Sequence, residues 1–279
     1  LTTKVSLTKY EITGEKELAG ASLELYAAER DANGNYTRKG DAIEKWTSTD
    51  KAHEIIGKLT AGASYILHET AAPNGYVVAS DVPFVVNPDG TVTKVAMKDD
   101  TTKVSITKKD ITGENEIAGA TLEVWDMQGN VIDSWVSNGT AHEISGILAA
   151  GAKYILHEVS APDGYVVATD VEFIVDANGK VTEVTMLDDT TKLHVTKKDI
   201  TGEKELAGAA LEVKDTDGNI IDAWVSDGTE HQIIGVLAVG KKYILHEVSA
   251  PNGYVVAEDV EFEVDVDGNI TRIEMHDDT

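Results

Sequence analysis

The chain has 279 residues, of which 42% are hydrophobic and 26% charged, and its formal net charge is −25. So acidic a surface argues against nucleic acids and anionic membranes as partners, because both are negatively charged. The sequence has no cysteine, which excludes disulfides, thiolate nucleophiles and cysteine-based zinc sites. It shows no signal peptide and no apolar stretch long enough to span a bilayer, so we expect no membrane insertion in this segment. Because it starts at Leu1 rather than Met, we also expect it to belong to a longer chain.

One unit occurs three times along the sequence. Its first signature, TKYEITGEKELAGASLEL at 8–25, returns at 107–124 and 196–213. A second signature, YILHETAAPNGYVVASDV, begins at Tyr65 and also returns twice, and every unit closes on Met-x-Asp-Asp. A unit of about 90 residues has the size of a small independent domain and is too long for a solenoid repeat. We therefore predict three tandem domains, over residues 1–100, 101–189 and 190–279.

In chain order, each unit begins with a predicted strand and continues with strand signals only. Within VSITKKD, Val104, Ile106 and Lys108 share a face, because successive side chains of a strand alternate. Other alternating runs, such as VEFEV at 260–264, are separated by turn pairs such as Asn33-Gly34. No long helical periodicity is present. Short antiparallel strands about ten residues apart predict an all-β fold with a β-sandwich in each unit.

The first unit differs from the others by an insertion, and the joints between units are short. About ten extra residues near 28–46 are expected to lengthen one hairpin loop. The joints MKDD-TTK and MLDD-TTK contain no Gly/Ser-rich or Pro-rich linker. Because such linkers are the usual source of flexibility between domains, we expect the three domains to form an elongated, stiff rod.

Each unit also directs three ionisable side chains toward its own core. In the first unit, Lys9, Glu69 and Asp99 each end an apolar stripe on the inward face of a predicted strand. The corresponding trios are Lys108, Glu158 and Asp188 in the second unit and Lys197, Glu247 and Asp277 in the third. The same alternation places the last acid of each unit on the solvent face; these acids are Asp100, Asp189 and Asp278.

Burying three ionisable groups is costly unless they meet. Burial disfavours the charged forms, so a neutral amine would face a protonated carboxyl group across an apolar pocket. Holding a nucleophile against an electrophile can correspond to effective molarities of about 10⁵–10⁸ M, and the second acid can shuttle protons. The product would be an isopeptide bond between the two side chains. The alternative interpretation is a structural salt bridge, or a lysine whose amine reaches water at the strand end.

The motifs resemble the B-type domain of the collagen adhesin Cna, which forms stalks of Gram-positive surface adhesins and recurs in pilin backbones. The pattern V-x-I/L-T-K, A-G-A-x-L-E, Y-x-L-x-E-x-x-A-P-x-G-Y and M-x-D recurs along the whole chain, with L-x-V-T-K as the first element of the third unit. The resemblance implies a prealbumin-like, Ig-like β-sandwich with an isopeptide bond between its first and last strands, assisted by the glutamate before A-P-x-G-Y. By position, the bonds would be Lys9–Asp99 with Glu69, Lys108–Asp188 with Glu158, and Lys197–Asp277 with Glu247.

The sequence departs from the family pattern at two places, and the first of them bears on the chemistry. Many members use asparagine as the acceptor, whereas this chain has aspartate, which implies loss of water rather than ammonia. The first unit has Tyr10-Glu11 where the others have Lys-Asp, but both positions lie beyond the reactive lysine. The sortase signal LPxTG and the pilin YPKN-type motif are absent, so this segment shows neither an anchor nor a polymerising lysine.

The function that the resemblance implies is structural. We expect a stalk or spacer segment of a secreted, cell-wall-anchored adhesin or pilus-like protein outside a Gram-positive cell. Its expected partners are further repeats and an anchoring or adhesive domain of the parent chain, and we expect a monomer with no cofactor, no metal and no turnover activity. The alternative is an adhesin module that binds a host or matrix component through the first unit. Aromatic and basic residues in the insertion support it; they are Tyr36, Arg38, Lys39 and Lys45.

Two features suggest metal sites but are interpreted differently. The histidines of the LHE runs lie next to the inward glutamates and should face solvent, and no HExxH motif occurs. Asp215-Thr-Asp217-Gly218-Asn219 has the look of a calcium loop, yet it lacks the closing glutamate of an EF-hand and is interpreted as a hairpin turn. The histidines considered are His68, His157 and His246, with His53, His142 and His231 standing one per unit.

Overall fold

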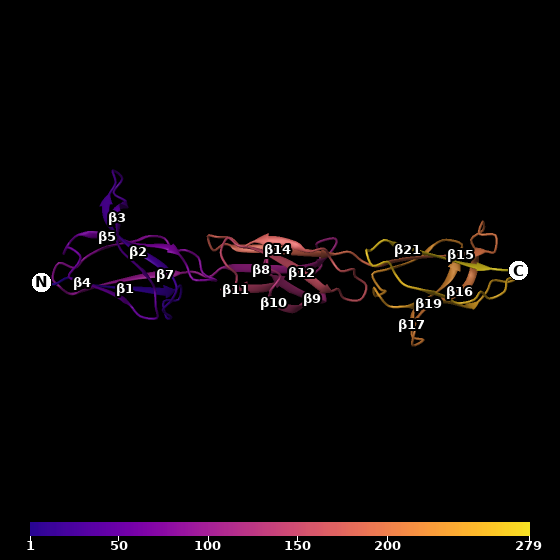
Figure 1. Ribbon diagram of the computed structural model, residues 1–279. Coiled ribbons are helices and arrows are strands. Elements are labelled where there is room, and N and C mark those ends of the chain that lie inside the picture. The colour runs from indigo at the N-terminus through magenta and orange to yellow at the C-terminus, as the bar shows by residue number, and fades with distance from the viewer. The chain divides into compact units, whose positions relative to one another are not determined.

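The computed structural model describes residues 1–279, and its regular elements are all strands. Each of the three repeats has seven strands arranged in a three-stranded and a four-stranded sheet (Figure 1). The all-β expectation is therefore confirmed. No helix long and apolar enough to cross a membrane is present.

The first repeat forms sheets of order β4-β1-β7 and β3-β2-β5-β6. Its strands are β1 (Lys4–Glu11), β2 (Ser22–Arg30), β3 (Tyr36–Thr47), β4 (His53–Ile56), β5 (Ser64–Ala71), β6 (Val82–Val85) and β7 (Val92–Asp99).

The second and third repeats have the same topology, with sheets β11-β8-β14 and β10-β9-β12-β13, then β18-β15-β21 and β17-β16-β19-β20. The strands of the second repeat are β8 (Lys103–Asp110), β9 (Ala118–Trp125), β10 (Val131–Asn138), β11 (His142–Ser145), β12 (Lys153–Ser160), β13 (Val171–Ile174) and β14 (Val181–Asp188). Those of the third are β15 (Lys192–Asp199), β16 (Ala207–Asp215), β17 (Ile220–Asp227), β18 (His231–Ile234), β19 (Tyr243–Ser249), β20 (Val260–Phe262) and β21 (Ile270–Asp277).

The core of each repeat lies between its two sheets and is built from alternate residues of the strands. In the first repeat, Val5 and Leu7 of β1 pack with Leu23 and Leu25 of β2 across the sandwich, and all four are buried. Their intervening neighbours are at least partly exposed. Because one face of each sheet packs on the core while the other meets water, the alternating pattern specifies which residues point inward.

The first and last strands of a repeat are direct neighbours and run parallel, which the expectation of antiparallel strands did not include. In the first repeat the register of β1 with β7 runs from Lys4 opposite Val92 to Glu11 opposite Asp99. The third repeat has the same register, with Lys197 opposite Met275. Between β1 and β7 the chain passes through the four-stranded sheet twice, as β2–β3 and as β5–β6, and the intervening β4 pairs with the other edge of β1.

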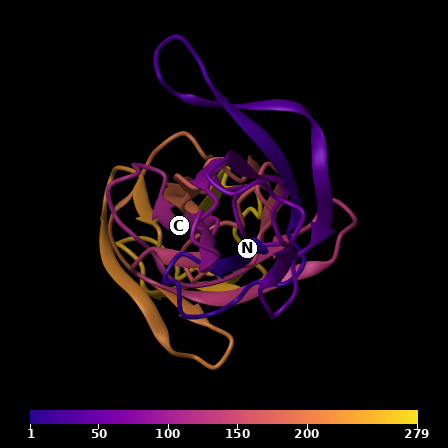
Figure 2. The same ribbon diagram turned by 90° about the vertical axis from the view of Figure 1, so that its left-hand side faces the viewer.

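The insertion of the first repeat lengthens the strands of a hairpin rather than its turn, so the expectation of a longer loop was wrong. The turn between β2 and β3 spans 31–35, and the corresponding turn of the second repeat spans 126–130. The extra residues lie at the end of β2, in β3 and in an irregularity of the pairing between them, where Gly40 has a φ of 69°. Figure 2 shows the lengthened hairpin, in indigo to violet, extending away from the rest of its repeat.

Because the extension projects into solvent, the first repeat should fold without it. We predict that replacing residues 26–46 by the equivalent segment of the second repeat, WDMQGNVIDSW, changes the free energy of unfolding by no more than about 1 kcal/mol. Thermal unfolding and amide hydrogen exchange in β2 and β5 measure this. Loss of cooperative unfolding of the first repeat would contradict it.

Candidate functional site

The three predicted ionisable residues of the first repeat meet inside the sandwich. The Lys9 Nζ of β1 lies 3.1 Å from Glu69 Oε1 of β5 and forms a close ion pair with Asp99 Oδ1 of β7. Strands β1 and β7 belong to one sheet and β5 to the other, so the contact spans the core. Because Lys9 lies opposite Met97 in the parallel register, its extended side chain reaches the aspartate two residues further along β7.

The other two repeats contain the same arrangement. Lys108 Nζ lies 3.2 Å from Glu158 Oε1, and Lys197 Nζ lies 3.2 Å from Glu247 Oε1. Each of these lysines also contacts the aspartate of its own repeat. In every repeat the lysine is 3% exposed, the glutamate 1% and the aspartate 0%. The structure thus places the predicted trios inward and together, while bond formation between them stays a prediction.

Burial shifts the acid–base properties of the carboxyl groups. Desolvation raises the pKa of Asp99 and of Asp188 to about 7, although the neighbouring lysine acts in the opposite direction. In the third repeat, desolvation raises the pKa of Glu247. In the first two repeats the nearby glutamate also contributes to the raised pKa of the aspartate, so we interpret the retained proton as one that the aspartic acid shares with its glutamate neighbour.

Two carboxyl oxygens at each site support a shared proton. In the first repeat Asp99 Oδ2 is buried and has no hydrogen-bond partner, while Glu69 Oε1 is buried with the Lys9 amine 3.1 Å away, and the equivalent atoms of the other repeats are in the same situation. Buried polar atoms are normally hydrogen-bonded. A proton on one carboxyl group would supply the missing donor, which is consistent with an aspartic acid rather than an aspartate facing the amine.

The other oxygen of each glutamate accepts a hydrogen bond from a backbone amide. Ala79 N–H donates to Glu69 Oε2 at 2.6 Å, and the equivalent bonds from Ala168 and Ala257 measure 2.7 Å. No pattern of side chains in the sequence predicts these donors. The equal spacing of ten residues from glutamate to donor is visible in the sequence only once the contact is known.

The last acids of the repeats only partly follow the predicted pattern. Asp278 is exposed as expected, whereas Asp100 and Asp189 are half-buried. None of the three belongs to a buried trio. Alternation along the last strand therefore distinguishes correctly between the inward and the outward acid at the end of each repeat.

The histidines are partnered side chains rather than freely solvated ones. His68 of the first LHE run points away from the trio and its Nδ1 lies 2.6 Å from Asp81, with equivalent pairs in the other repeats. His53 stacks on Trp46 at 4.2 Å between ring centroids and lies 2.7 Å from Glu44. The same stack occurs in every repeat, and its constant spacing of seven residues between Trp and His is the signal that the sequence analysis missed; the other pairs are Trp135–His142 and Trp224–His231.

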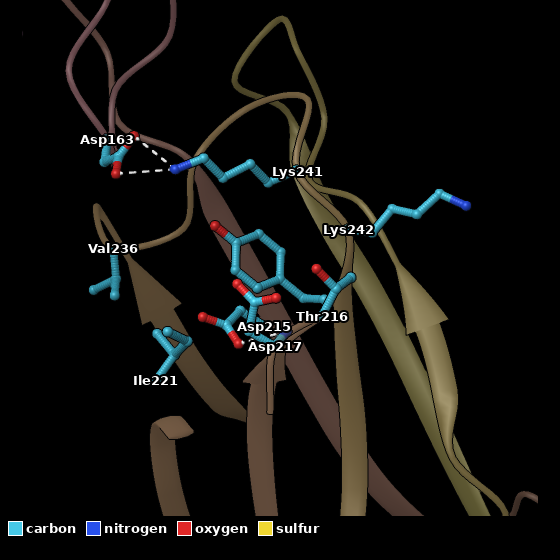
Figure 3. A pocket seen from close by; sticks show the side chains of 9 residues that line it. Asp163, Asp215, Thr216, Asp217, Ile221, Val236, Lys241 and Lys242 are labelled. Atoms are coloured by element: carbon cyan, nitrogen blue, oxygen red, sulfur yellow. Dashed lines mark hydrogen bonds and ion pairs between the residues drawn. The ribbon is translucent and has the colours of Figure 1, made fainter. Parts of the chain in front are cut away.

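No group of histidine, aspartate and glutamate side chains in the structure is arranged to hold a metal ion. The segment with the look of a calcium loop is the turn between β16 and β17, as interpreted. Asp215 Oδ1 accepts the backbone amides of Asp217 and Asn219 at 3.0 and 2.8 Å. Figure 3 shows this turn beside a surface pocket of about 560 Å³, to which no member of a buried trio contributes. The Asp215 carboxylate is therefore hydrogen-bonded within its own turn.

Comparison with protein families identifies the repeats. The SpaA prealbumin-like fold domain matches the chain three times, over residues 3–101, 102–190 and 191–279. The chain belongs to this family. The match confirms the resemblance that the motifs indicated, and the two-sheet topology of each SpaA-type repeat agrees with it. No curated protein sequence matches the chain.

Several solved structures are similar to the chain. The Bacillus anthracis TIE protein is 24% identical with a TM-score of 0.50, and the match covers 100% of this chain and 51% of that one. The chain thus spans about half the length of that protein. A streptococcal ancillary pilin is 15% identical (TM-score 0.42; 99% of each chain), and BcpA, the major pilin subunit of Bacillus cereus, is 16% identical (TM-score 0.41; 100% and 99%).

A carboxyl pair with a raised pKa predicts a particular pH dependence when its lysine is removed. In Lys108→Met no amine remains to lower the pKa of Asp188, so the folded state keeps a proton that the unfolded state has lost. Stability of the second repeat should therefore fall as pH rises from about 4 through about 7. Amide exchange in β8 and β14 measures it. Lys109→Met, on the opposite face of β8, is the control, and equal pH dependence in both variants would contradict the shared-proton assignment.

Proposed function

We propose that the chain is a structural segment of a cell-surface stalk, in which each SpaA-type repeat crosslinks its own first and last strands. The observation that supports it most directly is the buried Lys–Glu–Asp trio, which recurs with one geometry in all three repeats. A lone buried ion triad is weak evidence for stability, because apolar residues would fill the space at least as well. Condensation removes that difficulty, since it converts two of the three groups into a neutral amide.

The chemistry needs no group beyond the trio. The lysine ammonium passes a proton to the glutamate, and the freed Nζ attacks Cγ of the protonated aspartic acid. The Cγ–Nζ bond forms, the bond from Cγ to one Oδ breaks, and that oxygen leaves as water with one proton from the nitrogen. The glutamate relays this proton and ends protonated, so atoms and charge balance. Each site reacts once, and the protein is not a turnover enzyme.

The bond would stabilise a repeat by restricting its unfolded chain. The bonded residues lie 90 positions apart in the first repeat and 80 in the second and third. By analogy with a disulfide, closing loops of this size contributes on the order of 4–5 kcal/mol. Unlike a disulfide, an amide is independent of the redox state of its surroundings.

The parallel pairing of β1 and β7 supports a mechanical role. Force applied to the ends of the first repeat enters at Lys4 and leaves beyond Asp99, at opposite ends of the paired strands. The force therefore shears the two strands, and the hydrogen bonds between them bear the load at the same time. With a Lys9–Asp99 bond, force passes from β1 directly into the end of β7. The residues between the bonded positions are then bypassed.

A stalk segment implies an extracellular location and covalent neighbours. We propose that the parent protein is exposed on a Gram-positive cell surface, with further repeats and an anchoring or adhesive domain as its partners. The match of all three repeats to the SpaA prealbumin-like domain family supports such a setting. The chain's strongly acidic composition also fits a protein whose copies repel one another.

The alternative, ligand binding through the first repeat, rests on its projecting hairpin. The basic side chains there are already paired with acids, at 2.7 Å for Lys45–Glu24, 3.3 Å for Lys39–Glu29 and 3.5 Å for Arg38–Asp81. Tyr36 accepts a hydrogen bond from Arg30, whose guanidinium also lies over its ring. Paired charges leave less attraction for a charged ligand, so the stalk is the better supported function.

Intact mass of the denatured protein tests the bonds. Each amide expels one water, about 18 Da, so three complete bonds predict a deficit of about 54 Da. The deficit should fall by one water in each of Lys9→Ala, Lys108→Ala and Lys197→Ala. A full, unmodified mass would leave buried ion triads alone and would end the proposal.

Stretching a single molecule tests the mechanical role. In the bonded protein the second repeat should not release the 80 residues between Lys108 and Asp188. Lys108→Ala should release them, adding about 260–290 Å of extended chain at high force. The matched control, Lys109→Ala, should behave like the unaltered protein. An equal extension for all three proteins would exclude a force-bearing bond in this repeat.

A further inference from the structure

The loop that follows the glutamate contacts both carboxyl-bearing strands of each repeat. It spans 72–81 in the first repeat, 161–170 in the second and 250–259 in the third. We propose that this loop is a positioning element, which fixes the glutamate and the acceptor aspartate relative to each other through two backbone amides. This inference rests on the proposed isopeptide reaction and assigns a role to residues that lie outside the trio.

The first amide holds the glutamate. The N–H of Ala79, Ala168 or Ala257 donates to Oε2 of the glutamate in its own repeat, at 2.6, 2.7 and 2.7 Å. The bond is charge-assisted whenever the glutamate is ionised, and such bonds are among the stronger ones in proteins. It fixes one carboxyl oxygen, and the other, Oε1, lies 3.1–3.2 Å from the lysine amine.

The second amide holds the strand that carries the acceptor. The N–H of Val77 donates to the carbonyl of Asp100, the residue directly after the acceptor Asp99, at 2.9 Å. The second and third repeats have the same bond at 2.9 Å; it joins Val166 to Asp189 and Val255 to Asp278. One short segment therefore links the glutamate side chain to the backbone beside the aspartate.

The sequence of the loop explains how both amides reach their acceptors. In the first repeat the chain turns at Pro73-Asn-Gly-Tyr76, closed by the Tyr76 N–H to the Pro73 carbonyl at 3.1 Å, and Gly75 supplies the required positive φ of 85°. The two donors, Val77 and Ala79, are two residues apart. The motif A-P-x-G-Y-V-V-A thus encodes a turn that is directly followed by two donors, two residues apart.

The consequence for the reaction is orientation. A glutamate has three rotatable side-chain bonds, and without the amide its carboxyl group can turn away from the lysine. Proton relay requires hydrogen-bond reach, so a freed side chain is in place only part of the time. Losing a hydrogen bond to a charged group typically changes an equilibrium or rate constant by about 10- to 100-fold. We expect a reduction of this size in the rate of bond formation.

The test uses the whole chain with one repeat altered, so that the other two report on the same molecule. Ala257→Pro removes the amide hydrogen, and Ala257→Gly, the control, keeps it. Each chain is isolated unfolded, refolded by dilution and quenched at intervals, and the water lost from each repeat is counted from the masses of its proteolytic fragments. The third repeat of the proline variant should react about 10- to 100-fold more slowly. Its first and second repeats, and all repeats of the glycine variant, should react as in the unaltered chain.

A pH series separates positioning from a general loss of structure. The Ala257 amide lowers the pKa of Glu247 against the effect of burial, so removing it should move the pH dependence of the reaction in the third repeat to higher pH. A slower reaction with an unmoved profile would mean that the loop is only structural, and would overturn the inference. Equal rates in the proline and glycine variants would also overturn it.

A second variant keeps the test decisive if proline prevents the third repeat from folding. Glu247→Asp shortens the side chain by one carbon, so its carboxylate no longer reaches both the Ala257 amide and the lysine. It should slow the third repeat by a similar factor, and reaction at the unaltered rate would contradict the inference. An unaltered chain that loses no water from any repeat would instead refute the proposed bond itself.

Discussion

The burial of one lysine between two carboxyl groups is the constraint on which the rest of each repeat depends. A charged amine in a dry core is tolerated only where opposite charge or chemistry compensates it. In the first repeat that requirement brings Lys9, Glu69 and Asp99 from three strands and two sheets to one point. The parallel neighbourhood of β1 and β7 and the loop beyond β5 can both be understood as arrangements that make this meeting possible.

The same constraint is consistent with the close agreement of the three repeats at the trio, while the first repeat differs from the others at its surface. The lysine-to-glutamate distances vary by only 0.1 Å among the repeats. Away from the trio, the first repeat accommodates a longer hairpin, and the outer position beside its histidine is occupied by Tyr26, where the second repeat has Trp125. Positions that face water vary because they bear little on the core, whereas the trio can change only as a unit.

Much of this arrangement could be predicted from the sequence, because inward and outward positions of a strand follow from alternation alone. Lys9, Glu69 and Asp99 were placed inward on that basis and lie there. The parallel register was not predictable in this way, because it depends on which distant strand returns beside the first. The Ala79 amide was not predictable for a different reason. Almost every residue has a backbone N–H, so the type of residue does not indicate which amide binds the glutamate.

The hairpin shows a signal that was present and misinterpreted. The turn of the first repeat reads DANGN at 31–35, and that of the second reads DMQGN at 126–130. In both, the first aspartate accepts backbone amides from within the turn, so the turns are equivalent. Matching Asp31 with Asp126 and Asn35 with Asn130 would have assigned the extra residues to the strands rather than to the loop.

The pairing of the first strand with the last also governs when a repeat can mature. Lys9 is made early in the synthesis of its repeat, whereas β7 and Asp99 come at its very end, so the amine has no acceptor until the whole repeat has been synthesised. A chain that is still extended therefore remains a linear polymer. The proposed crosslink would form only after a complete repeat has been synthesised and has folded.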